Sequence, residues 1–215
     1  MSKTYKPLLE KYLSKTRYYS YKGIHLEVPP QVFHPGYFHS TQLLLQSIRS
    51  KSFKQKRFLE PGAGSGLISI YAALQGAIVT ATDINPIAIS TLHKNKIRNG
   101  AKLDILLSNL FDAIPVQAFD IIAINPPYYK KDPVSHTDYA WYCGANGEYF
   151  ENLFSKLSAY IHAESSIHMV LCDGCDIEMI QKISSHHGFK MNCIISRQTI
   201  IETNFIYKIE KRERA

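Results

Sequence analysis

The sequence lacks any run of apolar residues long enough to cross a bilayer, although 45% of its 215 residues are apolar. Its first residues, Met1-Ser2-Lys3-Thr4-Tyr5-Lys6, have no apolar core behind their charges, so we expect no secretory signal. A chain of this length can bury one core and carry a short appendage. These features predict a cytoplasmic protein that makes no membrane contact.

Cysteine is scarce, with four residues: Cys143, Cys172, Cys175 and Cys193. Cys172 and Cys175 form one C-x-x-C pair, but a structural zinc site needs four ligands and no second pair has matching spacing. The histidines have no carboxylate or cysteine cluster at ligand spacing. We therefore expect reduced thiols and no bound metal.

Acidic residues are rare in the N-terminal quarter of the chain. Residues 1–57 hold eleven Lys or Arg and two Asp or Glu, whereas the remainder holds fourteen basic and sixteen acidic residues. All of the excess positive charge therefore lies in this quarter. Basic residues interleaved with aromatic residues suit a phosphate-rich partner such as RNA or a ribosome surface. A solvated helix face with tyrosines packed onto the main domain explains the same pattern.

From Arg57 onward, short apolar runs alternate with helical patterns. The expected strands are 57–60, 77–82, 103–107, 119–124 and 167–171, and the expected helices are 67–75, 86–97, 148–161 and 176–186. Residues 189–197 and 200–209 are too close in sequence for a helical crossover, so we expect an antiparallel pair. The alternation predicts an α/β fold with a doubly wound, mostly parallel seven-stranded sheet, closed by this C-terminal pair.

Smaller elements are expected ahead of the sheet. These are a helix at 5–16, a hairpin of 17–21 and 24–28, and a helix at 41–48 with Ser40 as its N-cap. Because these pieces are too small for an independent domain, we interpret residues 1–52 as a basic, aromatic cap segment over the ligand edge of the sheet. Residues 53–215 then form the ligand-binding domain.

A glycine-rich turn, Glu60-Pro61-Gly62-Ala63-Gly64-Ser65-Gly66, follows the first expected strand of the sheet and precedes a helix. Its glycines allow a sharp turn and close approach of a ligand. Asp83 ends the next strand, at a separation that suits a carboxylate bound to a ribose hydroxyl pair. Glu60 would repel a pyrophosphate but attract the ammonium group of a methionine moiety, which favours S-adenosylmethionine over a dinucleotide.

The segment Asn125-Pro126-Pro127-Tyr128 ends the fourth strand at the same edge. The Asn125 side-chain oxygen and the Pro126 carbonyl can each accept a hydrogen bond from an NH₂ group whose lone pair is delocalised. The prolines hold both acceptors in place, and Tyr128 can stack on a planar group. The motif predicts methyl transfer to a planar amide or amino nitrogen, with catalysis mainly by positioning.

From about Phe58 to Ile209, the sequence resembles the class I S-adenosylmethionine-dependent methyltransferases with an N-P-P-Y motif. It is most similar to the HemK-like release-factor glutamine N5-methyltransferases. The resemblance implies a Rossmann-like fold, contacts from the glycine-rich turn to the methionine portion, and an Asn109 that marks the adenine. The expected cofactor residues are Glu60, Gly62, Ala63, Gly64, Gly66, Asp83, Asn109 and Asn125. The expected catalytic residues are Asn125, Pro126 and Tyr128, and the expected substrate-binding residues are Asn125, Pro127 and Tyr128.

Two flanking stretches carry the same resemblance. Residues 32–36 with Ser40-Thr41 are similar to the family segment that runs over the cofactor, and residues 140–147 to the Gly-rich stretch after N-P-P-Y. The family's acidic residue in the first stretch is replaced here by His39 or Ser40. The first fifty-odd residues are also too few for the N-terminal helical domain of the bacterial members. These departures leave the substrate open.

The leading hypothesis for the acceptor is a glutamine side-chain amide of a release factor or a ribosome-associated protein. The alternative is the N6 amino group of adenine in RNA (rRNA or tRNA) or DNA, because the N-terminal quarter is basic and aromatic. A third hypothesis, an idle adenosyl-binding module, conflicts with the intact motif. Residues 129–147 have the length of a lid, in which Lys130 and Lys131 could meet a phosphate or an acidic protein surface.

Overall fold

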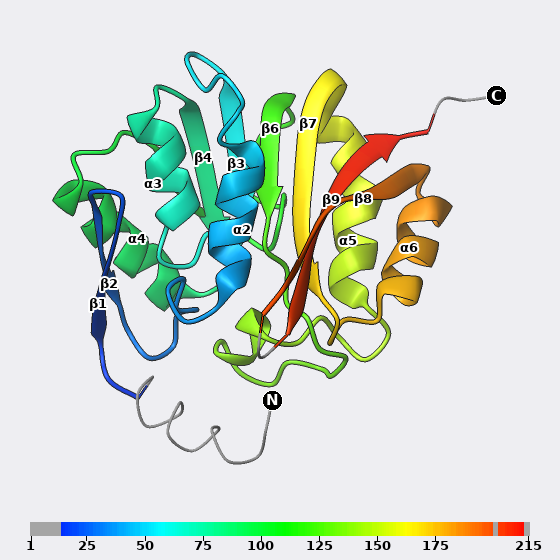
Figure 1. Ribbon diagram of the computed structural model, residues 1–215, viewed down its shortest axis with the longest axis horizontal. Coiled ribbons are helices and arrows are strands. Elements are labelled where there is room, and N and C mark those ends of the chain that lie inside the picture. Colours follow the sequence, from blue (N-terminus) through cyan, green and yellow to red (C-terminus); the bar gives the residue numbers. More distant parts are fainter. Residues whose placement is uncertain (1–13, 200–201, 213–215) are drawn as a thin grey trace.

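A seven-stranded sheet in the order β5-β4-β3-β6-β7-β9-β8 forms the centre of the computed structural model, which describes residues 14–199 and 202–212 (Figure 1). Its strands are β3 (Arg57–Pro61), β4 (Ile78–Asp83), β5 (Asp104–Leu107), β6 (Phe119–Ile124), β7 (Ile161–Cys172), β8 (Phe189–Gln198) and β9 (Thr203–Lys211). Strands β3 to β7 pair in parallel, and β9 pairs antiparallel with β7 and β8. The predicted sheet and its closing antiparallel pair are confirmed.

Helices cover both faces of the sheet. Helices α2 (His39–Ile48), α3 (Leu67–Leu74) and α4 (Pro86–Arg98) share one apolar core with the sheet, and α5 (Glu148–Leu157) and α6 (Ile177–His186) share the other. Consecutive strand residues alternate between these cores, as Phe58 and Leu59 do. The short apolar runs of the sequence are therefore strands buried on both faces.

The N-terminal hairpin, β1 (Arg17–Tyr21) and β2 (Ile24–Val28), has its predicted bounds. It turns at Lys22 (φ 49°) and Gly23 (φ 82°), two left-handed residues that match the twist of a two-residue hairpin. The hairpin is tied to α4, since the Asn99 side chain donates to the His25 carbonyl and accepts from the His25 amide (2.8 Å each).

Three expectations about helix and strand ends need correction. Helix α2 begins at His39 and its N-cap is Phe38, so Ser40 is a buried residue of the first turn and not the cap. Helix α5 ends at Leu157, and β7 begins at Ile161, six residues before the predicted strand. The early part of β7 is polar and largely exposed, so no apolar run marked it. The helix predicted at 5–16 lies outside the described residues except for 14–16, which are not helical.

The strands of the sheet end at two opposite edges. At the carboxyl edge, where the parallel strands β3, β4, β5 and β6 end, the following loops gather, and these positions hold most of the predicted site residues. The amino edge lies at the opposite end of the same strands (Figure 1).

Within the described residues, no helix is long and apolar enough to cross a membrane.

Candidate active site

The turn after β3 presents a glycine cradle at the carboxyl edge. Gly62 (φ 76°) and Gly64 (φ 55°) are left-handed, and the Gly62 and Ala63 amides donate to the Thr82 carbonyl (2.8 Å each). No atom lies within 4 Å of the position that a Cβ on Gly62 would take. The absent side chain thus leaves open space at the wall of a pocket that Gly62, Ala63 and Gly64 line.

Gly66 is placed differently from the other glycines of this turn. It has a φ of 87°, and a Cβ on it would lie 2.0 Å from Leu92 Cδ1. It is also absent from the residues that line the pocket. The structure therefore places Gly66 behind the pocket wall, where a glycine lets the start of α3 pack closely against α4.

The Glu60 side chain is buried at the pocket and reaches the first turn of α3. Its Oε2 accepts hydrogen bonds from the Ser69 amide (2.7 Å) and the Ser69 hydroxyl. Burial raises the pKa of this carboxyl to about 8; the Ser69 hydrogen bonds oppose the rise, and the nearby Asp83 carboxylate adds to it. A cation bound in the pocket would stabilise the ionised form of Glu60.

Asp83 is held by the backbone on both carboxylate oxygens. Its Oδ2 accepts from the Gly64 amide (2.8 Å) and its Oδ1 from the Asn85 amide (2.9 Å). Burial raises the pKa of Asp83, and these backbone hydrogen bonds work against that rise. The carboxylate therefore links the glycine turn to the start of α4, while Asn109, after β5, lines the wall beside it.

Asn125 and Tyr128 form a hydrogen-bonded unit after β6. The Tyr128 hydroxyl donates to Asn125 Oδ1 (2.7 Å), and Asn125 Nδ2 donates to Thr41 Oγ1 on α2 (3.4 Å). Burial raises the pKa of Tyr128 well above its usual range, so this hydroxyl remains a donor. The sequence indicated stacking for Tyr128 but could not reveal that its hydroxyl orients the Asn125 amide.

One pocket brings these separate loops together. Among the residues predicted for the site, those that line it are Glu60, Gly62, Ala63, Gly64, Asp83, Asn109, Asn125, Pro126, Pro127 and Tyr128. The family described as Methyltransferase small domain matches residues 25–142, more than half of the chain. The chain belongs to this family. It is an S-adenosylmethionine-dependent methyltransferase, and the predicted resemblance is confirmed.

Relatives of this methyltransferase act on different acceptors. A release factor glutamine methyltransferase of Geobacter sulfurreducens is 32% identical over 108 residues, which are 49% of this chain and 37% of that protein. The chain spans about half or less of the length of the curated relatives it matches.

Two solved structures share the fold at 18% identity. A T. thermophilus 16S rRNA methyltransferase (RsmC), in complex with AdoMet and guanosine, has a TM-score of 0.68 over 92% of this chain and 50% of that one. An E. cuniculi Mtq2 complex, responsible for methylation of the translation termination factor eRF1, has a TM-score of 0.64 over 84% of this chain and 99% of that one.

The methyltransferase pocket also has lining residues that sequence reasoning did not single out. They include Gln31, Tyr139 and Tyr149. Phe33, from the stretch predicted to run over the cofactor, lines the pocket and packs with its ring centroid 5.6 Å from that of Trp141. The resemblance pointed to these two stretches, but only the fold shows that they meet.

The loop after the N-P-P-Y motif is bound to the motif by its backbone. The Trp141 carbonyl accepts from the Tyr128 and Tyr129 amides (3.0 and 2.8 Å), and the Cys143 amide donates to the Tyr129 carbonyl (2.9 Å). Trp141 thus has a fixed position beside Tyr128. This part of residues 129–147 is a wall of the methyltransferase pocket rather than a loose connection.

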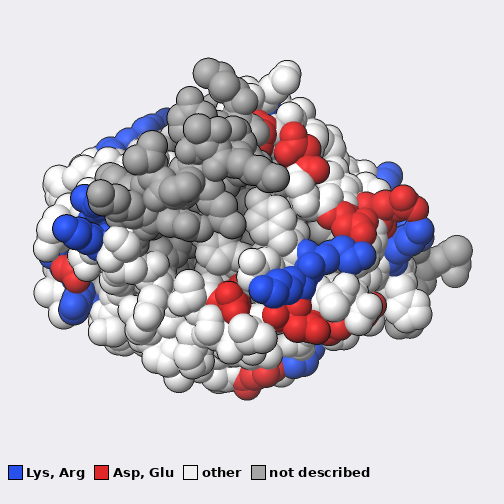
Figure 2. All heavy atoms as spheres, turned by 90° about the horizontal axis from the view of Figure 1, so that it is seen from below, with Lys and Arg blue, Asp and Glu red and all other residues white. Residues whose placement is uncertain are grey.

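The lysines nearest the motif already have partners. Lys130 forms an ion pair with Asp176 (3.2 Å), and the Lys131 ammonium lies 4.8 Å from the centroid of the Tyr142 ring. Figure 2 views the carboxyl edge end-on, and its visible described part has acidic and basic side chains interspersed. The surface of the methyltransferase drawn there is therefore not uniformly basic.

The C-x-x-C pair contains free thiols next to this site. Cys172 Sγ and Cys175 Sγ are 3.9 Å apart and are not bonded as a disulfide. In the part of the chain that the structure describes, no group of three or more His, Cys, Asp or Glu side chains could hold a metal ion.

Proposed function

We propose that this methyltransferase acts on a planar nitrogen, and that its acceptor is a glutamine side-chain amide of a protein. The observation that carries the proposal is the fixed Asn125 amide at the pocket wall, beside the Pro126 carbonyl. An amide nitrogen is a poor nucleophile because its lone pair is delocalised. Two acceptors held in place can orient such a group with little reorganisation.

The residues of the pocket fit S-adenosylmethionine. The open space at Gly62 admits a ligand close to the backbone, and Glu60 provides a buried carboxyl for an ammonium group. Asp83 stands where a ribose hydroxyl pair would bind, and Asn109 where the adenine would lie, as the resemblance implies. When bound, the cofactor supplies an electrophilic methyl group on a sulfonium centre.

The chemistry left to the protein is orientation of the acceptor. Asn125 Oδ1 has two lone pairs, and Tyr128 uses one of them. The second lone pair and the Pro126 carbonyl can each accept an N–H of the acceptor, which increases electron density on the nitrogen and directs its lone pair toward the methyl group. Pro127 and the Tyr128 ring would pack against the flat face of the acceptor group.

The charges around the motif give no support to a nucleic-acid acceptor. Lys130 and Lys131 are engaged within the protein, so they are less available for phosphates. The relative from Geobacter sulfurreducens, a release factor glutamine methyltransferase, points in the same direction. Adenine in RNA is the second candidate, because the aromatic rings of Phe33, Tyr139 and Trp141 line the pocket and could stack on a flipped base.

One labelling experiment separates the candidates. The protein is incubated with radiolabelled S-adenosylmethionine and a cell extract, and the products are digested with nuclease or with protease. We expect label that survives nuclease and is released by protease, with N5-methylglutamine in the hydrolysate. Label released by nuclease would refute the glutamine proposal and favour adenine. Absence of label despite cofactor binding would instead indicate an idle module.

Two variants at the motif test the assigned roles. Asn125→Ala should reduce transfer by more than about 100-fold while cofactor affinity by calorimetry stays within about threefold, because the acceptor oxygen serves the transition state. Tyr128→Phe keeps the ring but removes the donor to Asn125, and we expect a smaller loss, confined to kcat. Wild-type turnover in Asn125→Ala would remove that residue from catalysis.

A further inference from the structure

The connection from the end of α2 to the first residue of β3 is the most basic segment of the described chain. Its nine residues, Arg49-Ser-Lys-Ser-Phe-Lys-Gln-Lys-Arg57, contain five basic and no acidic side chains. All of these residues are exposed except Phe53. We call this segment the basic loop.

The basic loop is held in one conformation by its centre. Phe53 is 4% exposed and packs against Phe58 and Tyr71, with ring centroids 6.0 and 5.9 Å away. The Gln55 amide donates to the Gly76 carbonyl (2.9 Å), which fixes Gln55 in its left-handed conformation (φ 59°). The cations are thus carried on an ordered framework, so a ligand would bind with little loss of backbone entropy.

Most of these cations have no internal counter-charge. Lys56 pairs with Asp120 (3.1 Å). Within the described residues, no carboxylate lies within 4.0 Å of the side-chain nitrogens of the other four, which are Arg49, Lys51, Lys54 and Arg57. The Arg57 backbone amide donates to Asp120 Oδ2 (2.8 Å), but its guanidinium forms no ion pair with any described residue. Burial is the largest cause of the lowered pKa of His168, and the positive charge of Lys51 adds to it. The electrostatic field of these cations therefore extends into the protein. An unpaired cluster of this kind is an electrostatic footprint for an external polyanion.

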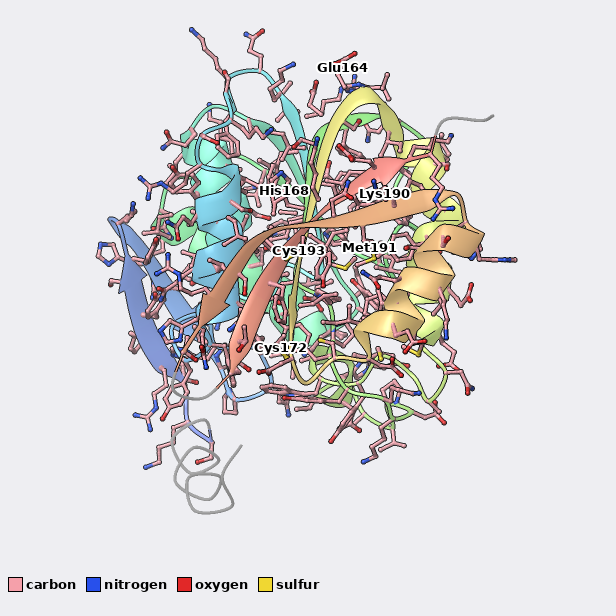
Figure 3. The ribbon with its side chains drawn as sticks, turned by 45° about the vertical axis from the view of Figure 1, so that its right-hand side comes forward. Glu164, His168, Cys172, Lys190, Met191 and Cys193 are labelled. Atoms are coloured by element: carbon pink, nitrogen blue, oxygen red, sulfur yellow. The ribbon has the colours of Figure 1, made fainter. Side chains whose placement is uncertain are left out.

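The position of the basic loop separates it from the methyl-transfer pocket. Helix α2 begins beside the pocket, where Thr41 contacts Asn125, and ends at Ile48, just before the basic loop. At 1.5 Å per residue, this helix carries the chain about 15 Å, from the carboxyl edge to the amino edge. Figure 1 shows the loop at the opposite end of the sheet from the pocket loops. Figure 3 shows Glu164 and Cys172 near the corresponding ends of β7.

We propose that the basic loop is a second binding surface, which contacts the phosphodiester backbone of a nucleic acid while the acceptor enters at the opposite edge. Protein–protein interfaces rely on apolar or aromatic anchors, and the loop's apolar residue, Phe53, is buried. The same burial leaves no apolar side chain to insert into a lipid surface. Phosphate binding needs only cations and hydrogen-bond donors, which the loop's serines and Gln55 supplement. The inference does not depend on which nitrogen is methylated.

Salt dependence provides the test. Binding of a fluorescent RNA hairpin and of a DNA duplex of equal length is measured by anisotropy from 50 to 200 mM salt. Four phosphate contacts predict a slope of log K against log salt of about −3.6, which is roughly a 150-fold loss over this range. The triple variant Arg49→Gln, Lys51→Gln, Lys54→Gln should bring the slope to about −0.9. A matched control, Lys22→Gln, Lys94→Gln, Lys182→Gln, removes the same net charge elsewhere and should behave like the wild type.

The outcomes are distinguishable. If RNA and DNA bind equally and only the triple variant loses this binding, the result supports recognition of the phosphodiester backbone. If the RNA hairpin binds more tightly and the triple variant loses this binding, the result supports the proposal and identifies RNA as the nucleic acid. Equal slopes for the triple and control variants would overturn the proposal, as would binding of anionic vesicles without binding of nucleic acid. Thermal melting and cofactor affinity of each variant, both expected to be unchanged, exclude misfolding as the cause.

Discussion

The buried carboxyl of Glu60 makes cofactor affinity depend on pH. With a pKa of about 8, Glu60 is mostly protonated in the free protein at neutral pH. A cofactor ammonium group beside it would favour the carboxylate, so binding releases a proton wherever the pH is below 8. The carboxyl is about 0.9 protonated at pH 7, and we expect about 0.9 protons released per cofactor bound.

The affinity change follows from the same linkage. Between pH 5.5 and pH 7, the ionised fraction of Glu60 in the free protein rises about 30-fold, so affinity should rise by the same factor, or roughly 2 kcal/mol. The upper limit avoids the range in which an α-amino group itself titrates, near 7.7–8.0. Calorimetry in two buffers of different ionisation enthalpy would count the protons.

The matched variant is Glu60→Gln, which retains an oxygen to accept from the Ser69 amide and hydroxyl but cannot ionise. Its cofactor affinity should lack the Glu60 part of the pH dependence. Equal slopes for wild type and variant would refute the linkage. If the variant has a lower melting temperature but the same dependence of cofactor affinity on pH as the wild type, Glu60 serves only to cap α3.

Three further predictions concern Asp83, His168 and the two glycines of the turn. Asp83→Ala should weaken cofactor binding at least 10-fold by calorimetry, and unchanged affinity would remove Asp83 from the site. Burial lowers the pKa of His168 to about 4, so the folded state favours its neutral form. The unfolding free energy should therefore fall by about 2–3 kcal/mol as pH drops from 6.5 to 4. Urea titrations should show this component missing in His168→Gln, and identical pH profiles would contradict it. Both Gly62 and Gly66 have positive φ, so alanine strains the backbone at either position, but only the Gly66 Cβ would also meet Leu92 at 2.0 Å. Gly66→Ala should therefore lower the melting temperature more, whereas Gly62→Ala should weaken cofactor binding more. Equal melting and binding changes in both would contradict that division.

The parts of the fold predicted best are those with a local signal. The hairpin at 17–28 has the bounds that its turn residues indicated, and the strand at 119–124 has the bounds of its apolar run. The first residues of β7 were missed because most of their side chains are polar or exposed. This early part of β7 pairs with β6 through Phe119 and Ile161. Ser40 was taken for a cap because the residue type fits, but α2 begins at His39, two residues before the predicted start, and buries Ser40.

The site was predictable where residue type alone defines the chemistry. Glu60 and Asp83 lie at the carboxyl ends of β3 and β4, Asn125 directly follows β6, and parallel strands bring such positions to one edge. What could not be predicted are contacts between side chains distant in sequence. The capping of α3 by Glu60 through Ser69 and the contact of Thr41 with Asn125 both depend on how helices seat against the sheet.

The charge of the N-terminal quarter shows how the fold changes an interpretation. In sequence, the basic residues appear as one group beside a segment that covers the pocket. In the structure, α2 runs between the edges of the sheet, so Thr41 reaches the pocket while Arg49 lies about 12 Å farther along the helix, with Lys51 beyond it. The composition of this quarter predicted a phosphate-rich partner. The fold directs that prediction to the amino edge, where the basic loop lies. The acceptor and the polyanion would then occupy separate surfaces, and removing the basic loop's charge should change recruitment to a nucleic acid without changing transfer at Asn125.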